Sequence, residues 1–261
     1  MTGFVETAQG VRIAYDREGS GPAVILVGGA GQFRAVDPGT RALTSELARR
    51  GYDVVHYDRP GRGDSGGEAP FTLEGEVAAV RALVEMVGGR ASLFGSSSGG
   101  AIALAAAVAV AGVERLLLWE VPLGAEEGED GAAFLAEIDA LAASGDREAT
   151  LRRFMAGMPP EWFEGMRNGP AWPMFERMAP SVRADAEALA WTQSAPRRRL
   201  WARVEVPVVV LLGAGAFPFF AEAADSMVAS LGRAERAEVP GAGHGWEPAD
   251  LAKALASHLS P

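Results

Sequence analysis

The motif with the clearest chemical potential is GSSSG at positions 95–99, where Ser97 has a glycine two positions away on each side. Residues 91–94 before it have the composition of a strand, and residues 101–111 after it have that of a helix. A sharp strand-to-helix turn strains the central serine and exposes its hydroxyl, and the flanking glycines avoid clashes. The motif therefore predicts that Ser97 is a nucleophile. The alternative is a glycine-rich turn with incidental serines.

A serine hydroxyl is a poor nucleophile unless a base accepts its proton. The chain has three histidines, and only His244 lies in a loop, the stretch PGAGHGW that follows a predicted strand at 235–239. His56 falls within a predicted strand and His258 within the last predicted helix. This context predicts that His244 is the base.

An acyl-transfer site also needs two backbone donors for the developing oxyanion. We expect one to be the N–H of Ser98, directly after the nucleophile. The other is expected in the glycine-rich loop 28–31 (GGAG), at Ala30 or, failing that, at Gly29. A phosphate-binding role for this loop is disfavoured, because neither of the common glycine-rich nucleotide motifs is present.

The elements around these residues alternate between strands and helices. Apolar runs predict strands at 11–15, 23–27, 53–57, 91–94, 115–119, 206–212 and 235–239. Helical spacing predicts helices at 40–50, 73–87, 101–111, 221–231 and 248–259. Such alternation predicts an α/β fold with a mostly parallel central sheet flanked by helices.

Residues 122–203 break this pattern, because they lack strands and read as amphipathic helices. We expect them to form a helical cap inserted into a core made of residues 1–121 and 204–261. A cap of this kind roofs the site, so its large apolar side chains predict a closed, apolar substrate pocket. The side chains expected to bind substrate are Trp162, Met166, Trp172 and Phe175 of the cap, together with Trp246.

The composition excludes several other classes of protein. Hydrophobic residues make up 48% of the 261, which favours a folded core, and the net charge of −10 disfavours nucleic-acid and anionic-membrane partners. There is no cysteine, and the histidines lack metal-ligand spacing, so no disulfide and no metal site are expected. No signal peptide or membrane-spanning stretch is recognisable, which predicts a cytoplasmic protein without membrane insertion.

Three stretches of the chain resemble the cap-bearing α/β-hydrolases common in actinobacteria: YDRPGRGDSG at 57–66, FGSSSGG at 94–100 and WEVP at 119–122. The similarity runs essentially from end to end. It implies a serine hydrolase that acts on an ester or thioester and needs no cofactor. Two departures bear on specificity: Gly28 stands where the family usually has histidine, and Ser96 where it has histidine or a larger residue.

The acidic member of a catalytic triad is not at its usual place in this fold. That place is three residues after the glycine that ends the strand at 206–212, and the residue there is Ala216. The other place is the end of the strand at 115–119, where Glu120 stands. A carboxylate at that position would orient His244 and stabilise its imidazolium. The alternative is a structural glutamate that pairs with an arginine of the cap.

The charged loop 58–65 (DRPGRGDS) is predicted to be structural, with its charges bonding to one another. The function expected is hydrolysis of an ester or thioester of a hydrophobic small molecule through an acyl-enzyme. The alternatives are a lyase, cyclase or C–C bond hydrolase with the same site, or a ligand-binding protein without turnover. Epoxide hydrolases and dehalogenases are disfavoured, because they need a carboxylate in place of Ser97.

Overall fold

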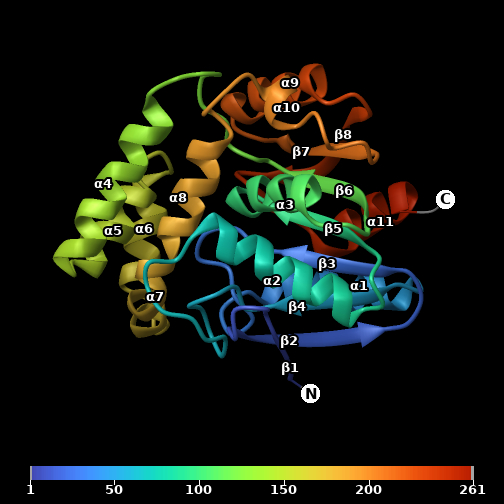
Figure 1. Cartoon of the computed structure of the whole chain (residues 1–261), viewed down its shortest axis with the longest axis horizontal. Coiled ribbons are helices and arrows are strands. Elements are labelled where there is room, and N and C mark those ends of the chain that lie inside the picture. Colours follow the sequence, from blue (N-terminus) through green and yellow to red (C-terminus); the bar gives the residue numbers. More distant parts are fainter. Residues whose placement is uncertain (1, 260–261) are drawn as a thin grey trace.

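A nine-stranded sheet forms the centre of the computed structural model, which describes residues 2–259 (Figure 1). The strand order is β1-β2-β4-β3-β5-β6-β7-β8-β9, and the pairs from β4 through β8 are all parallel. β2 pairs antiparallel with β1 and β4, and β9 pairs antiparallel with β8. The strands are β1 (Gly3–Glu6), β2 (Arg12–Gly19), β3 (Ala23–Val27), β4 (Asp53–Tyr57), β5 (Ala91–Ser96), β6 (Val113–Trp119), β7 (Val208–Gly215), β8 (Ala234–Ala242) and β9 (Gly245–Trp246).

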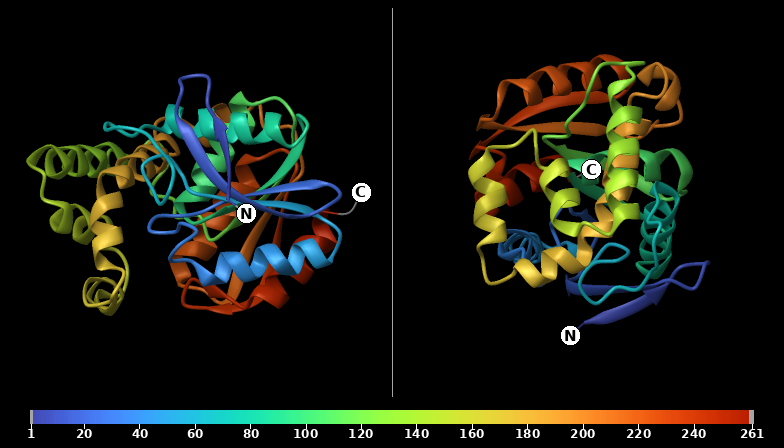
Figure 2. Two further views of the ribbon diagram at one scale, coloured as in Figure 1. Left: turned by 90° about the horizontal axis from the view of Figure 1, so that it is seen from below. Right: turned by 90° about the vertical axis from the view of Figure 1, so that its left-hand side faces the viewer.

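Helices cover both faces of this sheet. The helices are α1 (Pro38–Arg49), α2 (Leu73–Met86), α3 (Ser98–Ala109), α10 (Pro218–Ser230) and α11 (Pro248–Leu259). α1 and α11 share one buried apolar cluster, whereas α2, α3 and α10 share the other. The prediction of an α/β fold with a mostly parallel sheet between helices is therefore confirmed (Figure 2).

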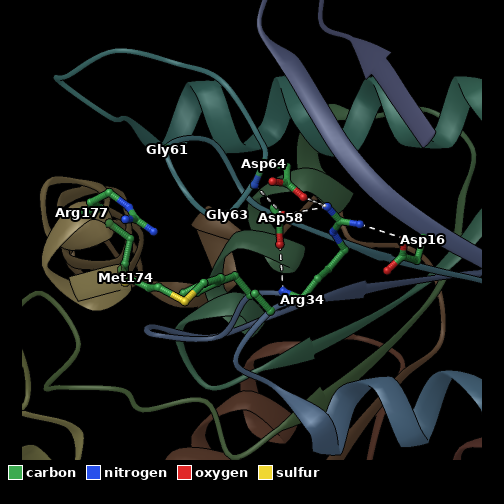
Figure 3. A pocket seen from close by; sticks show the side chains of 11 residues that line it. Asp16, Arg34, Asp58, Gly61, Gly63, Asp64, Met174 and Arg177 are labelled. Carbon is green, nitrogen blue, oxygen red and sulfur yellow. Dashed lines mark hydrogen bonds and ion pairs between the residues drawn. The ribbon is translucent and has the colours of Figure 1, made fainter. Parts of the chain in front are cut away.

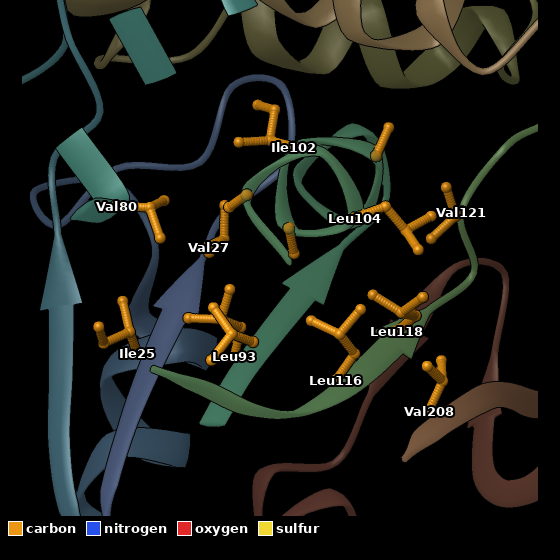
Figure 4. Close-up of a cluster of buried hydrophobic side chains, with 14 of the residues drawn as sticks. Ile25, Val27, Val80, Leu93, Ile102, Leu104, Leu116, Leu118, Val121 and Val208 are labelled. Atoms are coloured by element: carbon orange, nitrogen blue, oxygen red, sulfur yellow. The ribbon is translucent and has the colours of Figure 1, made fainter. Parts of the chain in front are cut away.

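The hydrophobic core explains why the central strands are continuous apolar runs. Every residue of β3 and β4 is buried, as a parallel strand covered on both faces requires. Figure 4 shows Val27, Leu93 and Leu116 from three neighbouring strands in one cluster with Ile102 of α3. α3 is itself buried on all sides over residues 98–106, which makes it a rigid base for the residues at its first turn.

A helical layer between β6 and β7 projects to one side of the sheet, at the left of Figure 1. Its helices are α4 (Asp130–Ser144), α5 (Arg147–Phe154), α6 (Pro160–Arg167), α7 (Trp172–Met178), the 3₁₀ turn η1 (Ala179–Ser181) and α8 (Val182–Trp191). α9 (Arg197–Leu200), which follows them in the chain, lies beside α10 instead (Figure 1). The layer has an apolar cluster of its own around Ile138, Leu151 and Phe163. α8 packs against both α4 and α3, so it joins this layer to the core.

Two strands have no counterpart in the sequence analysis, namely β1 and the two-residue β9. Both are short strands at the edges of the sheet. α3 also begins at Ser98 rather than at residue 101, because the elbow glycines are already helical. Over residues 2–259, none of the helices combines the length and the apolar character needed to cross a bilayer.

Candidate active site

Ser97 lies at the turn between β5 and α3, with φ of 55° and ψ of −130°. A non-glycine residue with this backbone is strained by about 1–3 kcal/mol. The glycines around it are required by space: a Cβ at Gly99 would lie 2.3 Å from Val27 O, and one at Gly95 would lie 2.5 Å from Gly100 Cα. The turn therefore has the form of a nucleophile elbow, with Ser97 at the positive end of α3.

Glu120 directly follows β6 and is 1% exposed. Its Oε2 lies 2.6 Å from Nδ1 of His244, and its Oε1 accepts a hydrogen bond of 2.9 Å from the N–H of Gly213. Because an ionised carboxylate only accepts hydrogen bonds, the ring proton belongs on Nδ1, which leaves Nε2 of His244 as an acceptor. The structure thus brings together the predicted acid and base, and it pairs Glu120 with His244 rather than with an arginine of the cap.

Strand register brings Ser97 and Glu120 to the same edge of the sheet, where the parallel strands end. Ser96 pairs with Trp119, and Trp119 pairs with Leu211, so Ser97 and Glu120 follow adjacent strand ends. The carboxyl ends of parallel strands form the usual site for ligands in α/β folds.

Backbone strain is concentrated at the same three residues. Within residues 2–259, four residues other than glycine have positive φ, and three of them are Ser97, Glu120 (43°) and His244 (72°). Such conformations cluster at functional sites, where the surrounding structure holds them. Three of the four strained positions are thus the residues that the sequence suggested for catalysis.

Phe220, which the sequence analysis did not single out, lies against His244. The two rings are stacked with centroids 4.5 Å apart and planes 8° apart. Phe220 is 1% exposed and belongs to the core cluster, so it provides a fixed surface for the imidazole. The signal in the sequence was the aromatic stretch FPFF at 217–220, directly after the position where the usual acid is missing.

The loop 28–31, called the oxyanion loop after the role expected for it from the sequence, lies close to the elbow. A Cβ at Gly29 would lie 2.9 Å from Cβ of Ser97. Ala30 and Gly29 were alternatives for the donor that this loop was expected to supply, and the N–H of each is hydrogen-bonded to a side chain. Ala30 N donates to Ser98 Oγ at 3.0 Å, and Gly29 N donates to Gln32 Oε1 at 2.6 Å. The N–H of Ser98 begins α3 and so has no acceptor within the helix.

The sequence analysis predicted that the charged residues of the loop 58–65 bond to one another, and for the two arginines this prediction is wrong. Asp58 does bond within its neighbourhood, because it accepts from the N–H of Asp64 and from Arg34. Arg59 and Arg62, however, do not pair with the acidic residues of their own loop. Both are buried and pair with Asp185 of α8, a partner more than 120 residues away that local sequence could not indicate.

A comparison with protein-family models matches residues 24–256 to the alpha/beta hydrolase family. The chain belongs to this family. Among solved structures, an alpha/beta hydrolase from Sphaerobacter thermophilus is 30% identical, with 99% of this chain and 100% of the other covered and a TM-score of 0.85. The thioesterase domain from the curacin biosynthetic pathway is similar in fold, at 19% identity, 99% and 98% coverage and a TM-score of 0.69.

One curated protein also matches, the polyketide synthase ThaQ from Burkholderia thailandensis. It is 35% identical over 124 residues, which are 47% of this chain and 6% of the synthase. The chain therefore corresponds to a small part of that protein. The family match and the Sphaerobacter structure confirm the α/β-hydrolase fold that the three sequence motifs implied.

The apolar side chains predicted to bind substrate separate into different places in this α/β-hydrolase. Trp162 packs against Phe217, which packs against Phe220, the residue whose ring contacts His244. Phe175 lies near the oxyanion loop, 3.8 Å from a Cβ placed on Gly31. Met166 and Trp172 belong to the apolar cluster inside the cap.

Trp246 does not lie with the cap side chains. Its ring contacts Phe94 and Trp119 edge to face, with centroids 5.9 and 5.4 Å apart. It packs in the cluster on the α1 and α11 face of the sheet. The reason is that β9 turns back along β8, which directs residue 246 to the sheet rather than to the cap.

A cavity of about 460 Å³ opens between α7 and the loop 58–64 (Figure 3). Met174 and Arg177 face it from α7, and Arg34, with Asp16 and Asp64 bonded to it, forms the opposite side. Neither Ser97 nor His244 is among its described lining residues. This charged cavity is therefore distinct from the apolar pocket expected over the nucleophile. Within residues 2–259, no group of three or more acidic or histidine side chains is arranged to bind a metal ion.

Proposed function

We propose that this chain is a serine hydrolase that cleaves an ester or thioester of a hydrophobic small molecule through a Ser97–His244–Glu120 triad. The observation that carries the proposal is the 2.6 Å contact between His244 Nδ1 and Glu120 Oε2, at the sheet edge where the strained Ser97 emerges. Membership of the alpha/beta hydrolase family supports hydrolytic chemistry at this place.

In the proposed mechanism, each residue of the triad has its own step in acyl transfer. Nε2 of His244 accepts the proton of Ser97 while Oγ attacks the substrate carbonyl carbon. Glu120 stabilises the imidazolium that results, and backbone N–H groups at Ser98 and in the oxyanion loop stabilise the negative oxygen. Collapse of the tetrahedral intermediate expels the alcohol or thiol, protonated by His244. Water, activated by the same histidine, then releases the acid from Ser97.

The substrate class follows from the aromatic surroundings of the base. Trp162, Phe217 and Phe220 form a continuous series of ring contacts that leads from the cap to His244. Such a surface gains free energy by covering an apolar acyl or aryl group. A thioester is included because two proteins similar to this chain are a thioesterase domain and a polyketide synthase. We propose no cofactor, and no partner other than this small molecule.

Turnover of a graded substrate panel tests the proposal. The purified chain is assayed on p-nitrophenyl esters of increasing acyl length and on N-acetylcysteamine thioesters of the same acids. We expect kcat/KM to rise with acyl length, and Ser97→Ala and His244→Ala to lower turnover by several orders of magnitude each, because triad members act as a unit. No turnover of either series by the wild type, or equal turnover by Ser97→Ala, would contradict the proposal.

A further inference from the structure

Asp185 of α8 is a cap residue whose carboxylate is fully buried against the core. It accepts hydrogen bonds from three core groups. Arg59 Nη1 lies 2.6 Å from Oδ1, Ser98 Oγ lies 2.6 Å from Oδ1, and Arg62 Nη2 bonds to Oδ2. One carboxylate thus joins the cap to the elbow and to the loop that follows β4.

Each of these three partners also bonds one backbone group of the oxyanion loop. Arg59 Nη1 donates to the carbonyl of Gly28 at 3.1 Å, and Arg62 Nη1 donates to the carbonyl of Gly29 at 2.7 Å. The N–H of Ala30 donates to Ser98 Oγ at 3.0 Å. Three consecutive residues of the loop are therefore fixed by groups that all meet at Asp185.

The charges determine which way the Ser98 hydroxyl points. Burial by itself would raise the pKa of Asp185, but the charges of Arg59 and Arg62 outweigh it and hold that pKa below its ordinary value. The carboxylate is therefore ionised and can only accept. The hydroxyl hydrogen of Ser98 goes to Asp185, and a lone pair of Oγ is left facing the N–H of Ala30.

Stability alone does not account for this arrangement. A buried ion pair contributes little net stability, because the cost of removing its charges from water offsets their attraction. Here the charges of Arg59 and Arg62 are balanced by Asp185 and Glu76, all of them buried. What distinguishes Asp185 is that its partners Arg59, Arg62 and Ser98 each reach the same loop.

We infer that Asp185 is a positioning residue, which sets the orientation of the Ala30 N–H in the oxyanion loop through Ser98, Arg59 and Arg62. The inference rests on the proposed function, since it concerns stabilisation of the oxyanion formed at Ser97. A charged oxyanion is a stronger acceptor than a neutral hydroxyl, so it displaces or shares the bond to Ser98. The hydroxyl keeps the donor oriented between turnovers, and the cap thereby controls the geometry of the oxyanion hole.

Ser98→Ala tests the Ser98 contact separately, because it removes the hydroxyl that joins Asp185 to the N–H of Ala30. The variant retains the backbone N–H of residue 98 and the bonds of Arg59 and Arg62 to the loop. Losing the orientation of a donor costs less than losing the donor, so we expect kcat to fall about tenfold with KM within about twofold. The affinity of a boronic acid, which forms a tetrahedral adduct on the serine, is expected to fall by about the same factor.

Thr192→Val is the matched control. Thr192 is a fully buried residue at the end of α8 whose hydroxyl donates to the carbonyl of Leu189 at 2.7 Å. Within residues 2–259 it makes no hydrogen bond with Asp185, Arg59, Arg62 or the oxyanion loop. The kcat and boronic acid affinity of this variant are expected within about twofold of the wild type, with a fall in Tm similar to that of Ser98→Ala. Asp185→Asn is expected to lower kcat further than Ser98→Ala; if it fails to fold, Ser98→Ala and Thr192→Val decide.

Labelling of the wild type at Ser97 by a fluorophosphonate is measured first. Absence of labelling would overturn both the proposed function and this inference. Labelling of the wild type together with unchanged kcat and boronic acid affinity in Ser98→Ala would overturn this inference alone. An equal loss in Thr192→Val would do the same, because it would trace the effect to stability.

Discussion

Phe220 lies flat against the imidazole of His244, with ring centroids 4.5 Å apart, on the segment where related folds carry the catalytic acid. In this chain, Ala216 stands at that position, and the carboxylate that contacts His244 is that of Glu120, directly after the neighbouring strand β6. The segment 213–220 nevertheless contacts both residues, because Gly213 N–H at the end of β7 donates to Glu120, and Phe220, in the first turn of α10, packs on His244. It does so without contributing a carboxylate of its own.

Phe220→Leu removes the flat surface beside the imidazole and keeps most of the apolar volume. General acid–base catalysis contributes about 10²–10⁴-fold, and a less well oriented base loses part of it, so we expect kcat to fall about tenfold. Unfolding free energy should fall by about 1–2 kcal/mol. Phe219→Leu is the control, since Phe219 contacts Phe220 with its ring tilted by 40°, is 41% exposed and, within residues 2–259, makes no ring contact with His244. Equal kcat in the two variants would refute the role of Phe220.

Glu120→Gln tests the acid. The amide has the same size, but it can present an N–H to the ring and so favour the wrong tautomer of His244. Steady-state kinetics should show kcat lower by about 10²–10⁴-fold with little change in KM, because the interaction is made mainly in the transition state. A loss below about tenfold would show that His244 works without a carboxylate.

The sequence was sufficient to predict the parallel strands of the sheet and the elbow, because both leave local patterns. The strands at 23–27 and 53–57 were predicted at their observed bounds, since buried parallel strands are unbroken apolar runs. GSSSG at 95–99 lies between a strand and a helix, where the spacing of glycine is dictated by close backbone approach. Glu120 and His244 could be proposed as partners because each follows a strand.

Contacts between distant segments could not be predicted in the same way. Asp185 reads as one acidic residue of an amphipathic helix, and its burial follows only from how α8 packs on α3. Phe220 and Trp246 are both aromatic residues near predicted strands, yet one meets His244 and the other packs on the opposite face of the sheet. The side-chain bonds made by the Gly29 and Ala30 N–H groups depend on Gln32 and Ser98, whose orientation has no sequence signature.

Trp162→Ala tests where the cap meets the substrate. Trp162 of the cap contacts Phe217 of the core. Loss of the apolar surface of Trp162 should raise KM for a long-chain ester about tenfold, which corresponds to about 1.4 kcal/mol of binding free energy. KM for an acetyl ester should change little. Trp172→Ala provides the comparison, since Trp172 packs on Phe163 within the cap. If Trp172→Ala produced the same selective change in KM, the assignment of Trp162 would be wrong.

His56 is buried in β4 and should make the fold sensitive to mild acid. Burial lowers the pKa of His56 below its ordinary value, and the carboxylates of Asp37 and Asp58 offset this only in part. The unfolded imidazole takes up a proton near pH 6.5 while the folded one stays neutral. Its contribution to stability is thus complete above about pH 6.5 and is lost below it, by at most about 1.4 kcal/mol per pH unit. Urea unfolding at a series of pH values should show the unfolding free energy falling with this slope below about pH 6.5 in the wild type and not in His56→Asn. The same slope in both proteins would refute the role of His56.

The most direct test of the triad is to find which residue a fluorophosphonate modifies. An activated serine reacts with this probe and an ordinary hydroxyl does not. Peptide mass spectrometry of the labelled protein should show one adduct, on Ser97, absent from Ser97→Ala and formed far more slowly in His244→Ala. An unlabelled wild type, or an adduct on Ser96 or Ser98 that persists in Ser97→Ala, would contradict the account.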